Sequence, residues 1–304
     1  MRRLTKSLLK ALSRASTRLN SHYKTYRRVH DVLNPVFRPA YKMLDRKIMN
    51  GDMQIPVRVF KPRENGLQKA IVFFHGGGWI AGDIDSYTRI CAHMADTTRH
   101  IVVSVNYRLA PENPFPAGLE DCYCAAREIF LDCSLLCCRH EDICLIGDSA
   151  GGNLAAAVSL LARDRGEFLP HKQVLIYPSV YYDHGPDSPF PSVRENGVDY
   201  LLTSERIQRY MEMYVPHAAD RCSPYVAPLL ARDLSRQPKT LIITARYDPL
   251  RDEAEAYGDK LREFGNHVSV FRIENALHGF LALPGKSEPV RECYAHINEF
   301  LETE

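Results

Sequence analysis

The sequence predicts an α/β fold in which helices cover both faces of one mostly parallel sheet. Short apolar runs, such as residues 70–74 and 143–146, have the length and composition of strands that are buried on both faces. Longer segments between such runs, among them residues 153–163, repeat apolar side chains at helical spacing. Strands that alternate with amphipathic helices are typical of a parallel sheet, so these two observations together predict the fold class.

The individual elements are expected in a definite order along the chain. Residues 42–61 should form a hairpin, because two short apolar stretches flank Asn50-Gly51, a dipeptide that tolerates the positive φ of a tight turn. The parallel strands are expected at residues 70–74, 101–105, 143–146, 174–177, 241–244 and 268–273. The helices that cover them are expected at residues 119–131, 153–163, 251–264 and 289–301.

The alternation of strands and helices lapses at about residues 181–230. This segment is rich in Pro, Asp, Ser and Tyr, and its one helical stretch, residues 204–214, gathers apolar and Tyr side chains on one face. We expect an insertion over one edge of the sheet. No repeat or linker divides the chain, so residues 1–304 should form one domain with a small helical cap from about residues 1–40 and 181–230.

Composition excludes several classes of protein. With 45% hydrophobic and 25% charged residues, the chain should bury a sizeable core. Its formal net charge of +2 is too small for a nucleic-acid partner, which requires a concentrated basic surface. No run of about 18 apolar residues occurs, so neither a membrane-spanning helix nor a secretory signal is expected.

The nine cysteines favour a reducing compartment. Their number is odd and their positions lack the paired spacing of small secreted domains, so free thiols in the cytoplasm are expected. The group from Cys122 to Cys144 raises the alternative of a structural zinc site. No Cys-x-x-Cys pair occurs in it, so buried thiols are the better account and no metal is expected. The sequence leaves open whether the chain forms a homodimer.

Ser149 lies in a Gly-x-Ser-x-Gly pattern between a predicted strand and a predicted helix. A serine between such elements sits on a sharp turn, and glycines are needed there because side chains would collide with the strand and the helix. The turn lifts the hydroxyl out of the sheet as a nucleophile. It also leaves the backbone N–H of Ala150 at a helix N-terminus, where it can stabilise a developing oxyanion.

A second motif, His75-Gly76-Gly77-Gly78, directly follows the predicted strand at residues 70–74. A phosphate-binding loop is an alternative, but no Gly-Lys-Ser/Thr follows to supply the cation and the metal ligand. Consecutive glycines let backbone N–H groups approach a substrate oxygen closely. We therefore expect Gly77 and Gly78 to donate to an oxyanion together with Ala150.

A serine hydroxyl becomes a good nucleophile only beside a base that a carboxylate holds in place. Among twelve histidines, His278 follows the predicted strand at residues 268–273, at the end where functional residues of parallel sheets collect. Asp248 also follows a predicted strand. Its competitor Asp252 falls in the first turn of a helix, where the helix dipole explains a carboxylate. The order Ser149, Asp248, His278 is that of nucleophile, acid and base in one large class of hydrolases.

The motifs together resemble those of the hormone-sensitive-lipase-like branch of the α/β-hydrolases, also called bacterial family IV esterases. The resemblance covers about residues 70–280 and rests on His75-Gly-Gly-Gly-Trp79, Tyr107-Arg-Leu-Ala-Pro-Glu112, Phe115-Pro-Ala117, Gly147-Asp-Ser-Ala-Gly-Gly152, Asp248-Pro-Leu-Arg-Asp-Glu253 and His278-Gly-Phe280. It implies a Ser149, Asp248 and His278 triad, a three-donor oxyanion hole and a two-part cap. The activity implied is hydrolysis of short-chain carboxylic esters through an acyl-enzyme, with no cofactor. A small-molecule receptor on the same fold and an amidase or deacetylase are the alternatives.

Residues 1–30 lie outside this resemblance and are strongly basic. Leucines recur there at near-helical spacing and no acidic residue precedes Asp31, so a basic amphipathic helix is expected. A cap helix is favoured because a hydrolase pocket needs something to close it. A membrane-surface helix and a mitochondrial transit peptide are alternatives, since both use Arg-rich, acid-poor segments. The basic residues are Arg2, Arg3, Lys6, Lys10, Arg14, Arg18, Lys24, Arg27 and Arg28.

Overall fold

A computed structural model describes residues 23, 24, 27, 42–64 and 68–303 of the chain. The strands are β1 (Lys42–Asn50), β2 (Met53–Lys61), β3 (Ala70–Phe74), β4 (Ile101–Val105), β5 (Ile143–Asp148), β6 (Lys172–Ile176), β7 (Lys239–Tyr247) and β8 (Val268–Leu277). The helices are α3 (Thr88–Thr98), α4 (Ala117–Leu131), α5 (Ala150–Arg165), α6 (Pro191–Asn196), α7 (Ser204–Tyr214), α8 (Arg251–Glu263) and α9 (Glu288–Glu302).

The strands form one sheet of eight, in the order β1-β2-β4-β3-β5-β6-β7-β8. The first two strands form the predicted antiparallel hairpin, in which Asn50 pairs with Met53 and Gly51 adopts a φ of 56° at the turn. β2 is antiparallel to β4, and every later pairing is parallel. The carboxyl ends of six parallel strands therefore meet at one edge of the sheet.

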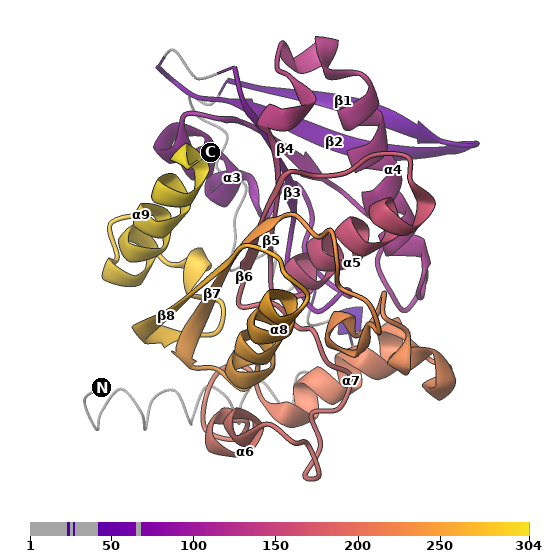
Figure 1. Ribbon diagram of the computed structural model, residues 1–304, viewed down its shortest axis with the longest axis vertical. Helices are drawn as coiled ribbons and strands as arrows, with labels where there is room; N and C mark the ends of the chain where they lie inside the picture. Colours follow the sequence, from indigo (N-terminus) through magenta and orange to yellow (C-terminus); the bar gives the residue numbers. More distant parts are fainter. Residues whose placement is uncertain (1–22, 25–26, 28–41, 65–67, 304) are drawn as a thin grey trace.

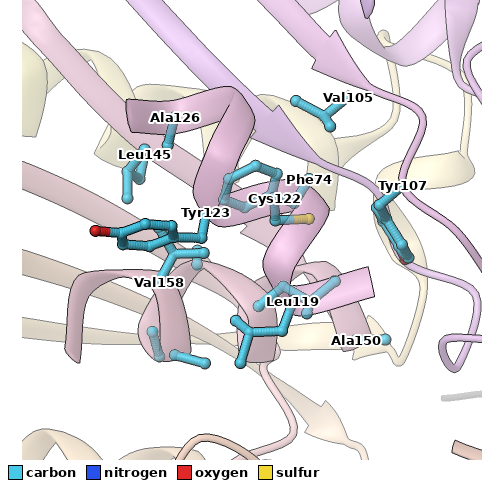
Figure 2. Packing of buried hydrophobic residues seen from close by; sticks show 14 of the residues in the cluster. Phe74, Val105, Tyr107, Leu119, Cys122, Tyr123, Ala126, Leu145, Ala150 and Val158 are labelled. Atoms are coloured by element: carbon cyan, nitrogen blue, oxygen red, sulfur yellow. The ribbon is translucent and has the colours of Figure 1, made fainter. Parts of the chain in front are cut away.

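Helices cover both faces of the sheet, as Figure 1 shows. One core lies under α4, α5 and α8, and a second lies on the opposite face under α3 and α9. Figure 2 shows α4 placing Leu119, Cys122 and Tyr123 into the first core, close to Phe74 and Leu145 of the sheet. Strands buried on both faces explain the continuous apolar runs that predicted them.

The predicted fold class is confirmed, and most element bounds agree within a few residues. The main omission is α3, a whole crossover helix between β3 and β4. Its sequence contains three threonines and no leucine, so helix propensity there is weak and burial against the sheet decides the structure. The segment at residues 181–230 contains α6 and α7, which lie together at the carboxyl end of the strands (Figure 1).

The predicted basic helix at residues 1–30 lies mostly outside the described residues. Within that region only Tyr23, Lys24 and Arg27 are described, and all three have helical backbone. Tyr23 packs against the first core, and the Arg27 guanidinium lies 5.1 Å from the centre of its ring. The cap formed by about residues 1–40 therefore stays a prediction that these three residues do not test.

Candidate active site

Each of the four segments that the sequence singles out for chemistry begins directly after a parallel strand. β3 ends one residue before His75, β5 one before Ser149, β7 one before Asp248 and β8 one before His278. Because these strands are neighbours or near neighbours in the sheet, their carboxyl ends bring the four loops together. The site is thus a direct product of parallel topology.

Ser149, His278 and Asp248 form a continuous chain of hydrogen bonds. The Ser149 hydroxyl lies 2.9 Å from Nε2 of His278, and Nδ1 of the same ring lies 2.7 Å from Oδ2 of Asp248. The Asp248 side chain is fully buried, whereas 11% of the His278 side chain is exposed. A base between a hydroxyl and a buried carboxylate can accept the hydroxyl proton while the carboxylate stabilises the resulting cation.

The turn that carries Ser149 has the strained backbone that the sequence predicted. Ser149 adopts φ 54° and ψ −118° between β5 and the first residue of α5. A Cβ on Gly147 would lie 2.1 Å from the carbonyl oxygen of Gly151, and a Cβ on Gly151 would lie 2.0 Å from that of Phe74. Both glycines are therefore required because the strand, the turn and the helix approach one another too closely for side chains.

The glycine loop, defined as residues 75–81, forms one wall of a cavity of about 230 Å³. Gly77 and Gly78 line this cavity with Ser149, Ala150 and His278, and their φ values of 117° and 63° lie in the left-handed region that favours glycine. A Cβ on Gly78 would lie 2.3 Å from the ring of Tyr210 in α7, so the missing side chain also lets α7 approach. The predicted donors thus line the same cavity as the predicted nucleophile, with Ala150 beginning α5.

His75 and Gly76 support the loop from inside the protein. The His75 ring is fully buried and stacks on Tyr107 at a centroid distance of 4.3 Å, while the Tyr107 hydroxyl donates to the His75 carbonyl at 2.7 Å. The backbone N–H of Gly76 donates to Oδ1 of Asp148 at 2.8 Å. Both residues support the motif structurally, and neither lines the cavity.

Asp148 is a functional candidate that the sequence analysis overlooked. Its buried carboxylate accepts from Gly76 N–H and from the hydroxyls of Tyr87 and Tyr177, at 2.8, 3.2 and 3.4 Å. Burial raises the pKa of Asp148 to about 6, while the three donors and the nearby His278 act in the opposite direction. The carboxylate joins the glycine loop to the turn that carries Ser149. Its only sequence signal was its place inside the Gly-x-Ser-x-Gly pattern.

The two aspartates that competed for the acid role have different surroundings. Oδ1 of Asp248 accepts from Leu250 N–H at 2.9 Å, which orients the carboxylate toward His278. Asp252 instead accepts from Ser192 N–H at 2.7 Å and pairs with its neighbour Arg251 at 2.7 Å. These donors hold the pKa of Asp252 below its ordinary value against the effect of burial, which is the largest influence and raises it. Asp252 therefore connects α6 to α8 and does not reach His278.

The tyrosines of the 181–230 segment are only partly at the cavity. Tyr210 lines it, whereas Tyr214 stacks on Trp79 at a centroid distance of 4.6 Å and an interplanar angle of 1°. Tyr181 contacts Tyr182, and Tyr200 contacts Tyr247 outside the cavity. The segment thus narrows the pocket with one tyrosine and braces the glycine loop with another.

All nine cysteines carry free thiols, and four of them, Cys91, Cys122, Cys144 and Cys293, are completely enclosed, where burial raises the pKa of each thiol. Within the described residues, no cluster of three or more His, Cys, Asp or Glu side chains could hold a metal ion. Among the same residues, no helix is both long and apolar enough to cross a membrane.

Comparison with known proteins gives consistent matches. A family model described as alpha/beta hydrolase fold matches residues 71–282. An arylesterase of Saccharolobus solfataricus is 36% identical over 253 residues, which cover 83% of this chain and 81% of the arylesterase. A gibberellin receptor of Arabidopsis thaliana is 30% identical over 268 residues, which cover 84% and 74%. The structure of a hyperthermophilic esterase from the archaeon Pyrobaculum calidifontis matches with a TM-score of 0.86 at 34% identity, covering 99% and 98%.

The matched region contains every predicted site residue, from His75 to His278. It also spans more than half of the chain, and the solved esterase covers nearly all of it. The chain therefore belongs to the α/β-hydrolase fold family, in the hormone-sensitive-lipase-like branch that its motifs predicted.

Proposed function

We propose that this protein is a serine carboxylesterase that hydrolyses short-chain carboxylic esters through an acyl-enzyme intermediate. One observation carries the proposal. Ser149, His278 and Asp248 are hydrogen-bonded in series beside a small cavity whose wall includes Gly77 and Gly78. The identity to an arylesterase over most of both chains supports the same activity.

In the first half of the reaction, Ser149 Oγ attacks the ester carbonyl carbon while Nε2 of His278 takes its proton. The carbonyl oxygen gains the negative charge, and the backbone N–H groups of Gly77, Gly78 and Ala150 stabilise it. Collapse of this tetrahedral intermediate breaks the bond to the alcohol oxygen, which leaves with the proton from His278. The acyl group remains on Ser149.

In the second half, His278 takes a proton from water, and the resulting hydroxide attacks the acyl carbonyl at the same oxyanion site. Collapse releases the carboxylic acid and returns the proton to Ser149. Asp248 keeps the proton on Nδ1 of His278 and stabilises the imidazolium in both halves. These reaction steps need no metal ion and no organic cofactor.

The size of the cavity supports short acyl groups. At about 230 Å³ it lies below the roughly 300–1,000 Å³ that is usual for drug-sized ligands. Tyr210 from α7 closes it over Gly78. We propose that residues 181–230 act as the cap and that this cap limits acyl length.

The cellular location and the oligomeric state of the protein are two further proposals. Nine free thiols support a cytoplasmic protein, because a reducing compartment keeps thiols unpaired. Fractionation of cells that express the chain tests this location. Whether it forms a homodimer is decided by sedimentation of the purified protein.

The defining experiment is a panel of aryl esters of increasing acyl length, assayed with wild type and with Ser149→Ala. Wild type should turn over acetyl and butyryl esters fastest. Ser149→Ala should keep the fold, as judged by circular dichroism, and lose at least about 1,000-fold in kcat. Retention of full turnover by Ser149→Ala would remove the proposed nucleophile.

The gibberellin receptor relative favours one second candidate, a small-molecule receptor that performs no turnover. The complete hydrogen-bonded series from Ser149 to Asp248 supports catalysis instead. An amidase or deacetylase would use the same residues, and a matched anilide beside the aryl ester separates these activities. Stoichiometric labelling of Ser149 by an organophosphate supports a hydrolase, and its absence supports the receptor.

A further inference from the structure

Arg27 makes an unusually complete set of contacts for a residue outside the motifs. Its Nε donates to the carbonyl of Ile80 at 2.6 Å, and one terminal nitrogen donates to the carbonyl of Ala110 at 2.8 Å. The two terminal nitrogens also form a bidentate pair with Glu112 at 3.0 and 2.8 Å. All three guanidinium nitrogens are therefore used, and two of the acceptors belong to the backbone next to the active site.

Ile80, which supplies the first acceptor, also closes the turn that carries the expected oxyanion donors through its backbone N–H. The carbonyl of Gly77 accepts from the N–H groups of Ile80 and Ala81 at 3.3 and 3.1 Å, which curls the glycine loop back on itself. Trp79 within this turn adopts a φ of 60°. A bulky residue keeps such a conformation only where surrounding contacts hold it. The position of the Gly77 and Gly78 N–H groups thus depends on contacts around residues 79–81.

Two further contacts hold the turn, and Arg27 supports one of them. The Trp79 ring stacks on Tyr214 in α7. The Trp79 carbonyl accepts from Ala110 N–H at 2.9 Å, and the carbonyl of that same Ala110 is the second acceptor of Arg27. One guanidinium therefore binds Ile80, which follows Trp79 in the glycine loop, and Ala110 in the segment that braces the loop.

Charge and shape suit arginine at this place. Its hydrogen bonds to Glu112 hold the pKa of that carboxyl below its ordinary value, so the pair is ionised at neutral pH. Four acceptor atoms on Ile80, Ala110 and Glu112 use all three nitrogens of the guanidinium, a fixed fork of donors that a lysine ammonium does not provide.

We propose that Arg27 is a positioning residue for the oxyanion hole, holding the glycine loop in its working shape through Ile80 and Ala110 without touching substrate. The proposal rests on the esterase function proposed above. It makes the catalytic rate depend on the contacts of Arg27 with the loop.

The test compares Arg27→Ala, Arg27→Lys and Glu112→Gln with wild type on a short aryl ester. Arg139→Ala is the matched control, because Arg139 also forms a bidentate pair with a carboxylate, that of Asp142, but on the surface away from the loop. Values of kcat are referred to active sites counted with an organophosphate, so unfolded protein does not contribute. The same assays are repeated with millimolar ethylguanidinium and, separately, with ethylammonium.

We expect Arg27→Ala to lose about tenfold in kcat with KM within about twofold of wild type, because the oxyanion forms only in the transition state. Ethylguanidinium should restore part of the loss, whereas ethylammonium and the lysine variant should not. Glu112→Gln should lose less, since both carbonyl contacts remain, and Arg139→Ala should match wild type.

The proposal would be overturned if Arg27→Ala had the same kcat per titrated active site as wild type. It would also be overturned by a loss confined to KM, or by a loss that follows reduced thermal stability and that ethylguanidinium does not relieve. These outcomes are distinct from failure of the esterase function, which would appear as lack of turnover by wild type itself.

Discussion

Among the described residues, Asp248 and Glu253 are buried carboxylates that each bind a histidine, and of these two pairs only the first lies at the candidate active site. Asp248 binds His278 and Glu253 binds His184, each at 2.7 Å, and the two carboxylates are five residues apart in sequence. Both carboxylates are fully buried. By distance and burial of the acid alone, either pair could orient a catalytic base.

The two pairs differ in the contacts of the second ring nitrogen of the histidine and in the other contacts of the carboxylate. The second nitrogen of His278 faces the Ser149 hydroxyl and the cavity, whereas His184 is fully buried and its Nδ1 has no hydrogen-bond partner among the described residues. Glu253 also accepts from the backbone N–H groups of Val180 and Tyr181 at 2.8 and 3.1 Å. The second pair therefore fastens the start of the 181–230 segment to α8. A carboxylate and a histidine become catalytic only where the ring also meets a nucleophile and a substrate.

The largest expected effect comes from exchanging each acid for its amide. Asp248→Asn should lower kcat by about 10,000-fold, because an amide cannot hold His278 in the tautomer that accepts the Ser149 proton. Glu253→Gln should leave kcat within about threefold, since the acid that orients His278 is unchanged. Steady-state kinetics of both variants on one aryl ester provide the measurement. If the two losses were similar, the distinction between a catalytic and a structural pair would be wrong.

These two pairs also show which parts of the candidate site can be predicted from the sequence. The proximity of Ser149, Asp248 and His278 could be predicted because each follows a recognisable strand, and parallel topology then brings strand ends together. The Glu253 and His184 pair could not, because His184 lies in an irregular segment whose path is set by tertiary contacts. Asp148 and Arg27 were missed because their hydrogen-bond partners are distant in sequence, at 29 to 72 residues for Asp148 and 53 to 85 residues for Arg27. Local patterns predict elements, whereas long-range polar contacts require the folded chain.

Asp148 extends the comparison to a buried carboxylate that has no histidine partner. Its pKa of about 6 exceeds the ordinary value of 3.8, so between these values the folded state keeps a proton that the unfolded state has lost. Stability from this group is therefore greatest below pH 4 and declines as pH rises through 6. Relative to Asp148→Asn, which does not titrate, wild type should lose on the order of 3 kcal/mol of unfolding free energy between pH 4 and 7.

Urea unfolding of wild type and Asp148→Asn at several pH values measures this difference. The same substitution should lower kcat about tenfold, because an amide supplies a weaker acceptor for Gly76 N–H and loosens the glycine loop. A stability difference that stays constant with pH would contradict the assigned burial effect. A fully active Asp148→Asn would separate the carboxylate from the oxyanion hole.

Glu253→Gln should show its main effect in stability. Removing the charge weakens the contacts to His184 and to the two backbone N–H groups, and hydrogen bonds to charged groups contribute about 1.5–3 kcal/mol. We expect a loss of about 2 kcal/mol in the free energy of unfolding, measured in urea with an unchanged denaturant slope. An unchanged midpoint would mean that this pair does not fasten the segment to α8.

The smallest expected effect tests whether the 181–230 segment also acts on the catalytic pair. Asn196, the last residue of α6, donates its side-chain amide to the carbonyl of Asp248 at 3.2 Å. The same carbonyl also accepts from the backbone N–H of Arg251 at 3.2 Å. Asn196→Ala removes one of these two donors and should cost about 1 kcal/mol of stability. Because the same carbonyl belongs to the triad acid, kcat should also fall, by a few-fold, with KM unchanged. Asp187→Ala, an exposed change in the same segment, is the control and should alter neither quantity. A loss of stability at full kcat would mean that the 181–230 segment supports the fold without orienting Asp248. A fall in kcat would show that the Asp248 and His278 pair also depends on contacts from this segment.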